Sequence, residues 1–171
     1  MSVFYAVMLL VIAERLSELF IARRNTRRLL EKGGIEYGAG HYPAIVLLHA
    51  GWLVALLVLV PHGRPPNWWF LGPFLAIQPL RYWIIATLGE RWTTRVIVLP
   101  GVAPVQTGPY RFIRHPNYCI VALEILLLPL AFDAWLVGLV FTIANAAVLK
   151  HRISVEEMAI MGAGSQNREQ S

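Results

Sequence analysis

The sequence predicts an all-α integral membrane protein, a bundle of about five transmembrane helices with a long loop on the cytosolic side. Composition is the first observation, because 57% of the 171 residues are hydrophobic and only 15% are charged, whereas soluble domains carry more charge. The second observation is a series of five apolar segments. The third is that the basic residues gather on one side if every segment crosses the membrane.

Glycine, proline and charged residues separate the five apolar segments. The segments are Val3–Ala22, Tyr42–Val60, Trp68–Leu88, Asn117–Ala131 and Ala134–Leu149. A stretch of about 20 apolar residues suits a hydrocarbon core about 30 Å thick. Because the last two segments are shorter, we expect them to form a tight helical hairpin.

Polar side chains interrupt several of these segments. Acidic or basic residues lie within predicted helices at Glu14, Arg15, Glu18, Arg81 and Glu124. Isolated charges in a bilayer are costly, so they should face the bundle interior and pair. We therefore expect Arg81 to pair with one or more of the three carboxylates. We interpret His49 and Trp52 of the second segment as ordinary packing residues.

The basic residues predict the orientation. Three basic clusters, within 23–32, 91–114 and 150–152, fall on one side of a five-span chain, and the other side receives Arg64 and Asp133. The positive-inside rule then places the N-terminus outside and the C-terminus in the cytosol.

The chain reads as one domain over residues 1–161, followed by a tail, 162–171, that we expect to be disordered. Cys119 is the only cysteine, so an internal disulfide is excluded, and the sequence shows no metal-ligand spacing. The net charge of +5 comes from clusters beside apolar runs rather than from a basic face, so no nucleic-acid partner is expected. The oligomeric state stays open.

The segment 88–118 is too rich in glycine and proline to be one helix. Its apolar pieces Thr93–Leu99 and Val102–Gln106 are typical of short strands. A long ordered loop on a bundle is a common place for a ligand. The alternative, a solvated connector, is disfavoured by apolar residues such as Trp92 and Val96.

The run Gly108–Tyr118, GPYRFIRHPNY, marks a helix start. Pro116 fits the first turn, and His115 before it is restricted to an extended cap position. Free N–H groups of this turn favour a carboxylate or another anion. The alternative is a basic interfacial anchor with Tyr118 at the membrane surface.

The fifth segment adds a polar stripe. Asn145, Leu149, Arg152 and Glu156 follow at spacings of four, three and four residues and so share one helix face. A simple pair between Arg152 and Glu156 is the alternative. Combined with the preceding helix start, the stripe predicts a pocket with both charge signs, suited to a zwitterionic ligand.

GPYRFIRHPNY at 108–118 and RISVEE at 152–157 resemble the paired motifs of the isoprenylcysteine carboxyl methyltransferase family of membrane methyltransferases. The resemblance covers the chain from about Leu88 onward. ERLSELFIARRN at Glu14–Asn25 is similar to a bacterial branch that methylates alkylpyrones or alkylresorcinols. After Glu157 the family's aromatic tail is missing.

The resemblance implies S-adenosylmethionine bound at the cytosolic face, so that the long loop is a cofactor-binding loop. It implies cofactor contacts from Val102, Ala103, Pro104, Val105, Tyr110, His115, Pro116, Asn117, Tyr118 and Glu156. It also implies that Arg152 is the catalytic residue and faces the methyl acceptor.

We therefore expect an S-adenosylmethionine-dependent O-methyltransferase of a bacterial inner membrane. Its partners would be membrane lipid and a lipophilic or lipidated acceptor with a carboxylate or a phenol or enol hydroxyl. The alternatives are a phospholipid N-methyltransferase and a non-catalytic membrane partner or transport protein. A transporter is disfavoured because broken helices and paired repeats are not evident.

Overall fold

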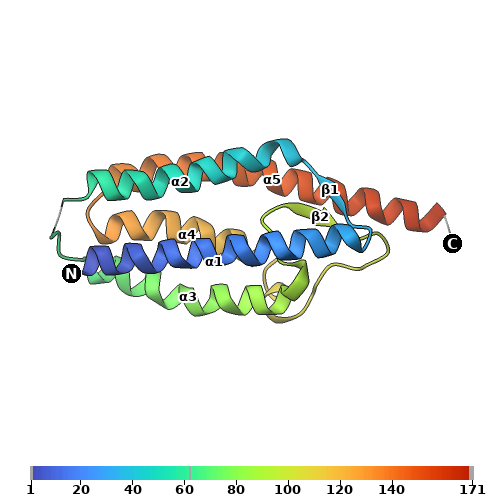
Figure 1. The fold of residues 1–171 in the computed structure, drawn as a ribbon, viewed down its shortest axis with the longest axis horizontal. Coiled ribbons are helices and arrows are strands. Elements are labelled where there is room, and N and C mark those ends of the chain that lie inside the picture. The colour runs from blue at the N-terminus through green and yellow to red at the C-terminus, as the bar shows by residue number, and fades with distance from the viewer. Residues whose placement is uncertain (1, 62, 170–171) are drawn as a thin grey trace.

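The computed structural model describes residues 2–61 and 63–169, which form a bundle of five α-helices (Figure 1). The helices are α1 (Val3–Glu31), α2 (Tyr42–Leu59), α3 (Trp68–Leu88), α4 (Pro116–Ala131) and α5 (Trp135–Glu169). Helix α5 continues into the segment 162–171 that the sequence predicts as a tail, and residues 170–171 lie outside the described part. The all-α prediction is confirmed.

The helices lie side by side along the long axis and alternate in direction (Figure 1). Helix α4 packs mainly against α3 and α5, and α2 packs against α5. One end of the bundle holds the start of α1 and the α4–α5 turn, where Arg64 pairs with Asp133. The other end holds the strands and the long loop. The three basic clusters therefore share one end.

Helix α1 continues past Ala22, the predicted end of the apolar segment, and includes the basic residues that follow it. It ends before Gly33, whose φ of +84° only glycine adopts without strain. The chain then forms β1 (Ile35–Tyr37), which pairs antiparallel with β2 (Val96–Val98).

Strand β2 lies within the predicted piece Thr93–Leu99, so this prediction is confirmed. The strand predicted at Val102–Gln106 is wrong. Pro104 has no N–H to give to a ladder, and Val102 is exposed rather than packed. The loop is nevertheless tied to α1, because the Asn25 side chain donates to the carbonyls of Gly89 at 3.0 Å and Trp92 at 2.9 Å.

Within the described residues, two helical stretches are long and apolar enough to cross a membrane, namely α2 and Trp135–Gly162 of α5. Helix α4 is apolar but shorter. The prediction of five membrane spans therefore stays a prediction, while the helical bundle itself is established.

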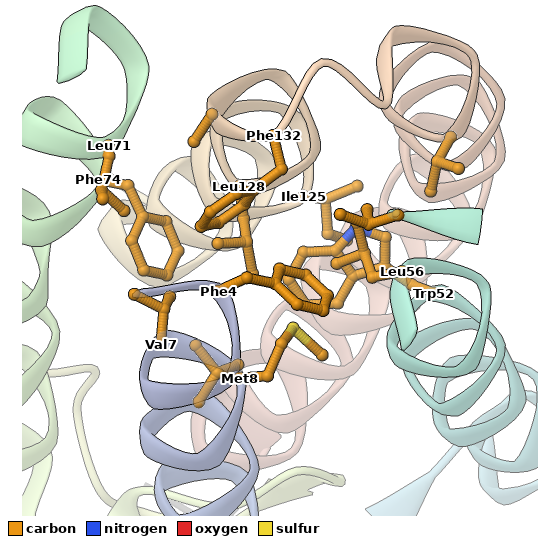
Figure 2. Close-up of a cluster of buried hydrophobic side chains, with 14 of the residues drawn as sticks. Phe4, Val7, Met8, Trp52, Leu56, Leu71, Phe74, Ile125, Leu128 and Phe132 are labelled. Atoms are coloured by element: carbon orange, nitrogen blue, oxygen red, sulfur yellow. The ribbon is translucent and has the colours of Figure 1, made fainter. Parts of the chain in front are cut away.

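A hydrophobic core closes the end of the bundle near the N-terminus (Figure 2). Phe4 and Phe132 meet edge to face with ring centroids 5.0 Å apart. Trp52 is only 3% exposed and belongs to this cluster, so its predicted packing role is confirmed.

Arg81 of α3 forms the centre of a buried ionic network. Its guanidinium donates to both oxygens of Glu18 on α1 and, at 2.8 Å, to Glu124 on α4. Arg15 also contacts Glu18 at 3.2 Å and Glu124 at 3.3 Å. The predicted pairing of Arg81 is thus confirmed for two carboxylates, whereas Glu14 accepts a hydrogen bond from a tyrosine of α3.

Arg81→Met should destabilise the bundle by about 3–5 kcal/mol, because it leaves two buried carboxylates with too little positive charge. Thermal unfolding of the purified protein in detergent measures the change. Arg27→Met is the control, since the Arg27 side chain is 79% exposed and its pair with Glu31 is worth only a few tenths of a kcal/mol. Equal effects of the two substitutions would contradict the account.

Candidate functional site

The Tyr118 hydroxyl joins the start of α4 to α5. It donates a hydrogen bond to the Glu156 carboxylate and accepts one from Nε of Arg152 at 3.0 Å. Arg152, which is 8% exposed, also donates from Nη1 to the carbonyl of Thr94 at 2.6 Å. Arg152 and Glu156 are therefore not a simple pair along one helix. They share a tyrosine, and the loop before β2 completes the cluster.

Two buried polar atoms at the start of α4 have no hydrogen-bond partner in the described part of the chain. They are Nε2 of His115 and Oδ1 of Asn117. The His115 ring stacks on Tyr118 with centroids 5.3 Å apart, and its Nε2 lies 3.8 Å from Glu157. Buried polar groups are normally satisfied, so this helix start has the character of a ligand site.

The helix start offers fewer free amides than the sequence suggests. The N–H groups of Tyr118 and Cys119 both donate to the His115 carbonyl, and Pro116 has none. Among the described residues, the Asn117 N–H finds no acceptor. One backbone donor, rather than a whole turn, is therefore available to an anion.

Tyr110 lies in a short 3-10 turn, Gly108–Arg111, above this cluster. Burial, together with the nearby Glu156 carboxylate, raises the pKa of the Tyr110 phenol, so the phenol stays neutral at physiological pH. The predicted contact segment Val102–Val105 is largely exposed. Arg91 holds it through the Ala103 carbonyl at 2.8 Å, but no hydrogen bond in the described structure joins it to Glu156.

A cavity of about 300 Å³ lies beside the cluster. Its walls are mainly apolar and come from all five helices and from the loop before β2. Its polar lining consists of Arg15, Glu18, Tyr42, His49, Arg81, Thr93, Thr94, Asn117, Tyr118, Asn145 and Arg152. Leu16 of α1 and Val46 of α2 both line it and are exposed on the bundle surface, so the cavity opens sideways between these two helices.

The cavity brings most of the predicted stripe together. Asn145, which is 2% exposed, lines it with Leu149 and Arg152. Glu156 lies one turn farther along α5, on the other side of Tyr118. Glu156 does not line the cavity, so the stripe runs from the cavity wall to a carboxylate outside it.

Sequence reasoning missed two features of this site. The Thr94 carbonyl carries no side-chain signal, and its role depends on how the loop folds. His49 lines the cavity rather than only packing in the helix bundle. A histidine within an otherwise apolar segment is the signal that would have found it.

The sequence is similar to known proteins over most of its length. The family model of the isoprenylcysteine carboxyl methyltransferase family matches residues 70–162, which include α4, the long loop and the Tyr118–Arg152–Glu156 cluster. The chain therefore belongs to this family. Membership in this family indicates a membrane methyltransferase.

Two relatives extend the similarity to nearly the whole chain. The chain is 38% identical over 161 residues to the uncharacterized protein YpbQ of Bacillus subtilis, covering 92% of this chain and 96% of that one. It is 25% identical over 158 residues to an uncharacterized protein of Haemophilus influenzae, covering 88% and 90%. No solved structure matches.

Tyr118→Phe should destabilise the protein by about 1–3 kcal/mol, because Arg152 and Glu156 each lose a partner in a buried setting. Unfolding in detergent measures the change. Tyr37→Phe is the control, since the described structure shows no hydrogen bond from that hydroxyl, and we expect less than about 0.5 kcal/mol. An equally small effect of Tyr118→Phe would contradict the claim that the Tyr118 hydroxyl connects Arg152 and Glu156.

Proposed function

We propose that the protein is an S-adenosylmethionine-dependent O-methyltransferase that acts in the membrane on a lipophilic acceptor. One observation carries the proposal. Arg152 donates to Tyr118, which holds Glu156, and the same arginine lines the apolar cavity. A polar cofactor on the Glu156 side and a lipophilic molecule in the cavity would therefore meet at Arg152.

The residues at the start of α4 fit the polar part of the cofactor. The Asn117 N–H would donate a hydrogen bond to the cofactor's carboxylate. Nε2 of His115 and Oδ1 of Asn117 are buried atoms that lack partners within the described residues. Glu156 offers a carboxylate for the ammonium group or the ribose hydroxyls. When bound, the cofactor supplies a methyl group that its positively charged sulfur already activates.

The other predicted cofactor contacts enter the proposal through family membership. The Glu156 carboxylate acts on the Tyr110 phenol, so Tyr110 would border the bound cofactor. Pro116 is buried beneath it. Val102, Ala103, Pro104 and Val105 belong to the exposed part of the loop and would cover the cofactor from the cytosolic side.

One nitrogen of Arg152 is left for the acceptor. Nε and Nη1 are used by Tyr118 and Thr94, and Nη2 makes no hydrogen bond within the described residues. A guanidinium beside a carboxyl, phenol or enol favours its ionised, nucleophilic form. The protein then contributes alignment and exclusion of water, which are the main requirements of a methyl transfer.

The same arginine disfavours the N-methyltransferase alternative. A protonated amine acceptor in the cavity would lie beside the positively charged Arg152. Like charges repel strongly in a poorly solvated site. An oxygen acceptor gains from the same charge. The chemistry of the site therefore favours O-methylation.

The proposal includes the arrangement in the membrane. With five spans, the end that carries the basic clusters and the loop faces the cytosol of a bacterial cell. The cofactor would enter there, and the acceptor would enter from the lipid through the opening between α1 and α2. The exposed Leu16 and Val46 at this opening suit contact with acyl chains.

Glu156→Gln should weaken binding of S-adenosylhomocysteine by about 1.5–3 kcal/mol through loss of a charged hydrogen bond. Arg152→Ala should leave that affinity nearly unchanged and lower turnover or raise the acceptor's KM. Calorimetric titration and methyl-transfer kinetics measure the two effects, with the distant, exposed Glu31→Gln as control. The reverse pattern would show that cofactor and acceptor are assigned to the wrong sides.

Single cysteines in place of Ser2, Arg64 and Arg168, in a Cys119→Ala background, test the orientation. Labelling of intact cells with a membrane-impermeant maleimide should modify the cysteines at 2 and 64 only if they face outside. Five spans with an outside N-terminus place Ser2 and Arg64 outside and Arg168 in the cytosol. The cysteines at 2 and 64 should therefore be labelled, and the cysteine at 168 should be protected. Finding Arg64 and Arg168 on the same side would exclude the five-span arrangement.

A further inference from the structure

The cavity has a second polar region, away from the one at Arg152. It is formed by Arg15 and Glu18 of α1, His49 of α2 and Arg81 of α3, all of which line the cavity. We call these four residues the inner subsite. The four side chains come from three helices and border the same cavity.

Contacts along α2 give the depth of the inner subsite. The Tyr42 hydroxyl lies 3.4 Å from the Thr94 hydroxyl, and the Thr94 carbonyl accepts from Arg152. Tyr42 is therefore level with Arg152. His49 follows Tyr42 by two turns of α2, which at 1.5 Å per residue is about 10 Å deeper.

The hydrophobic core limits how far a ligand can extend beyond this point. Trp52 and Leu56 follow His49 on α2 and belong to the core that fills the end of the bundle (Figure 2). A ligand that reaches His49 cannot continue along the bundle axis. Its apolar tail has to leave sideways, past Leu16 and Val46.

The hydrogen bonding of His49 fixes what its free nitrogen can do. Nδ1 lies 2.9 Å from the Ile45 carbonyl on the same helix. A carbonyl only accepts, so Nδ1 carries the proton and Nε2 has the lone pair. Nε2 makes no hydrogen bond within the described residues, and His49 lines the cavity. Nε2 is therefore an acceptor that a ligand in the cavity can use.

The ionic groups of the inner subsite do not call for an anion. Arg81 and Arg15 are both matched by Glu18 and Glu124. A carboxylate of a ligand would find no unpaired cation in the inner subsite. It would also be repelled by the lone pair on Nε2 of His49. A neutral group with an N–H or O–H has an acceptor in Nε2 and polar neighbours on α1.

We propose that the inner subsite binds a second polar group of the methyl acceptor, a hydroxyl or an amide N–H that lies about 10 Å from the oxygen to be methylated. This inference rests on the proposed function, since it takes the acceptor to occupy the cavity. The acceptor class is then an amphiphile with two separated polar groups. A saturated chain with a single polar end would leave His49 without a partner.

Two probes test the inner subsite: a long-chain para-alkylphenol, and the same phenol with one hydroxyl on its chain about 10 Å from the phenol oxygen. Binding of each to the full-length protein in detergent is measured by calorimetry. The native protein should bind the hydroxylated probe about fivefold more tightly, as one neutral hydrogen bond allows. His49→Phe should abolish this preference, and His49→Gln, which keeps an acceptor, should retain part of it.

Val54→Phe, which adds a ring to an exposed position of α2, is the control and should keep the full preference. Affinity for S-adenosylhomocysteine shows that each variant is folded. Equal binding of both probes to the native protein, no binding of either, or an unchanged preference in His49→Phe would overturn the inference.

Methyl transfer to the probes is scored separately. A preference without transfer would refute the proposed function alone, and transfer without a preference would refute the inner subsite alone.

Discussion

The pairing of Arg81 with Glu18 and Glu124 is the constraint on which the rest of the structure depends. Three helices supply these side chains, and none of them can turn its charge toward an apolar surrounding without a large cost. The register of α1, α3 and α4 is therefore fixed at one level of the bundle. Helix α2 takes no part in the network and packs mainly against α5, which leaves room for a cavity between α1 and α2.

The same constraint places the functional groups. Since α4 is fixed at Glu124, its first turn brings Tyr118 to a set depth, and α5, which follows through a tight turn, brings Arg152 and Glu156 beside it. The loop is held from the other side by Asn25, so the Thr94 carbonyl meets Arg152. The cluster thus depends on helix packing as much as on the residues that form it.

Much of this architecture could be predicted from the sequence. The apolar runs gave the bounds of α2 and α3 closely, because proline, glycine and tyrosine mark their ends. The stripe on α5 was readable because it follows helical periodicity. What failed depended on tertiary contacts: the apolar piece Val102–Gln106 looked like a strand but has no partner strand, and His49 looked like packing because its cavity forms between helices distant in sequence.

The central claim is that a cofactor held at Glu156 and an acceptor held in the apolar cavity meet at Arg152, so that a methyl group passes from the polar cofactor to the lipophilic acceptor. Its most direct test is incubation of the purified protein with methyl-labelled S-adenosylmethionine and a bacterial membrane lipid extract, followed by extraction into organic solvent. The account predicts label in a lipid-soluble methyl ether or methyl ester that is lost in Arg152→Ala. Label confined to water-soluble products or to methylated amines, with Arg152→Ala equal to the native protein, would contradict it.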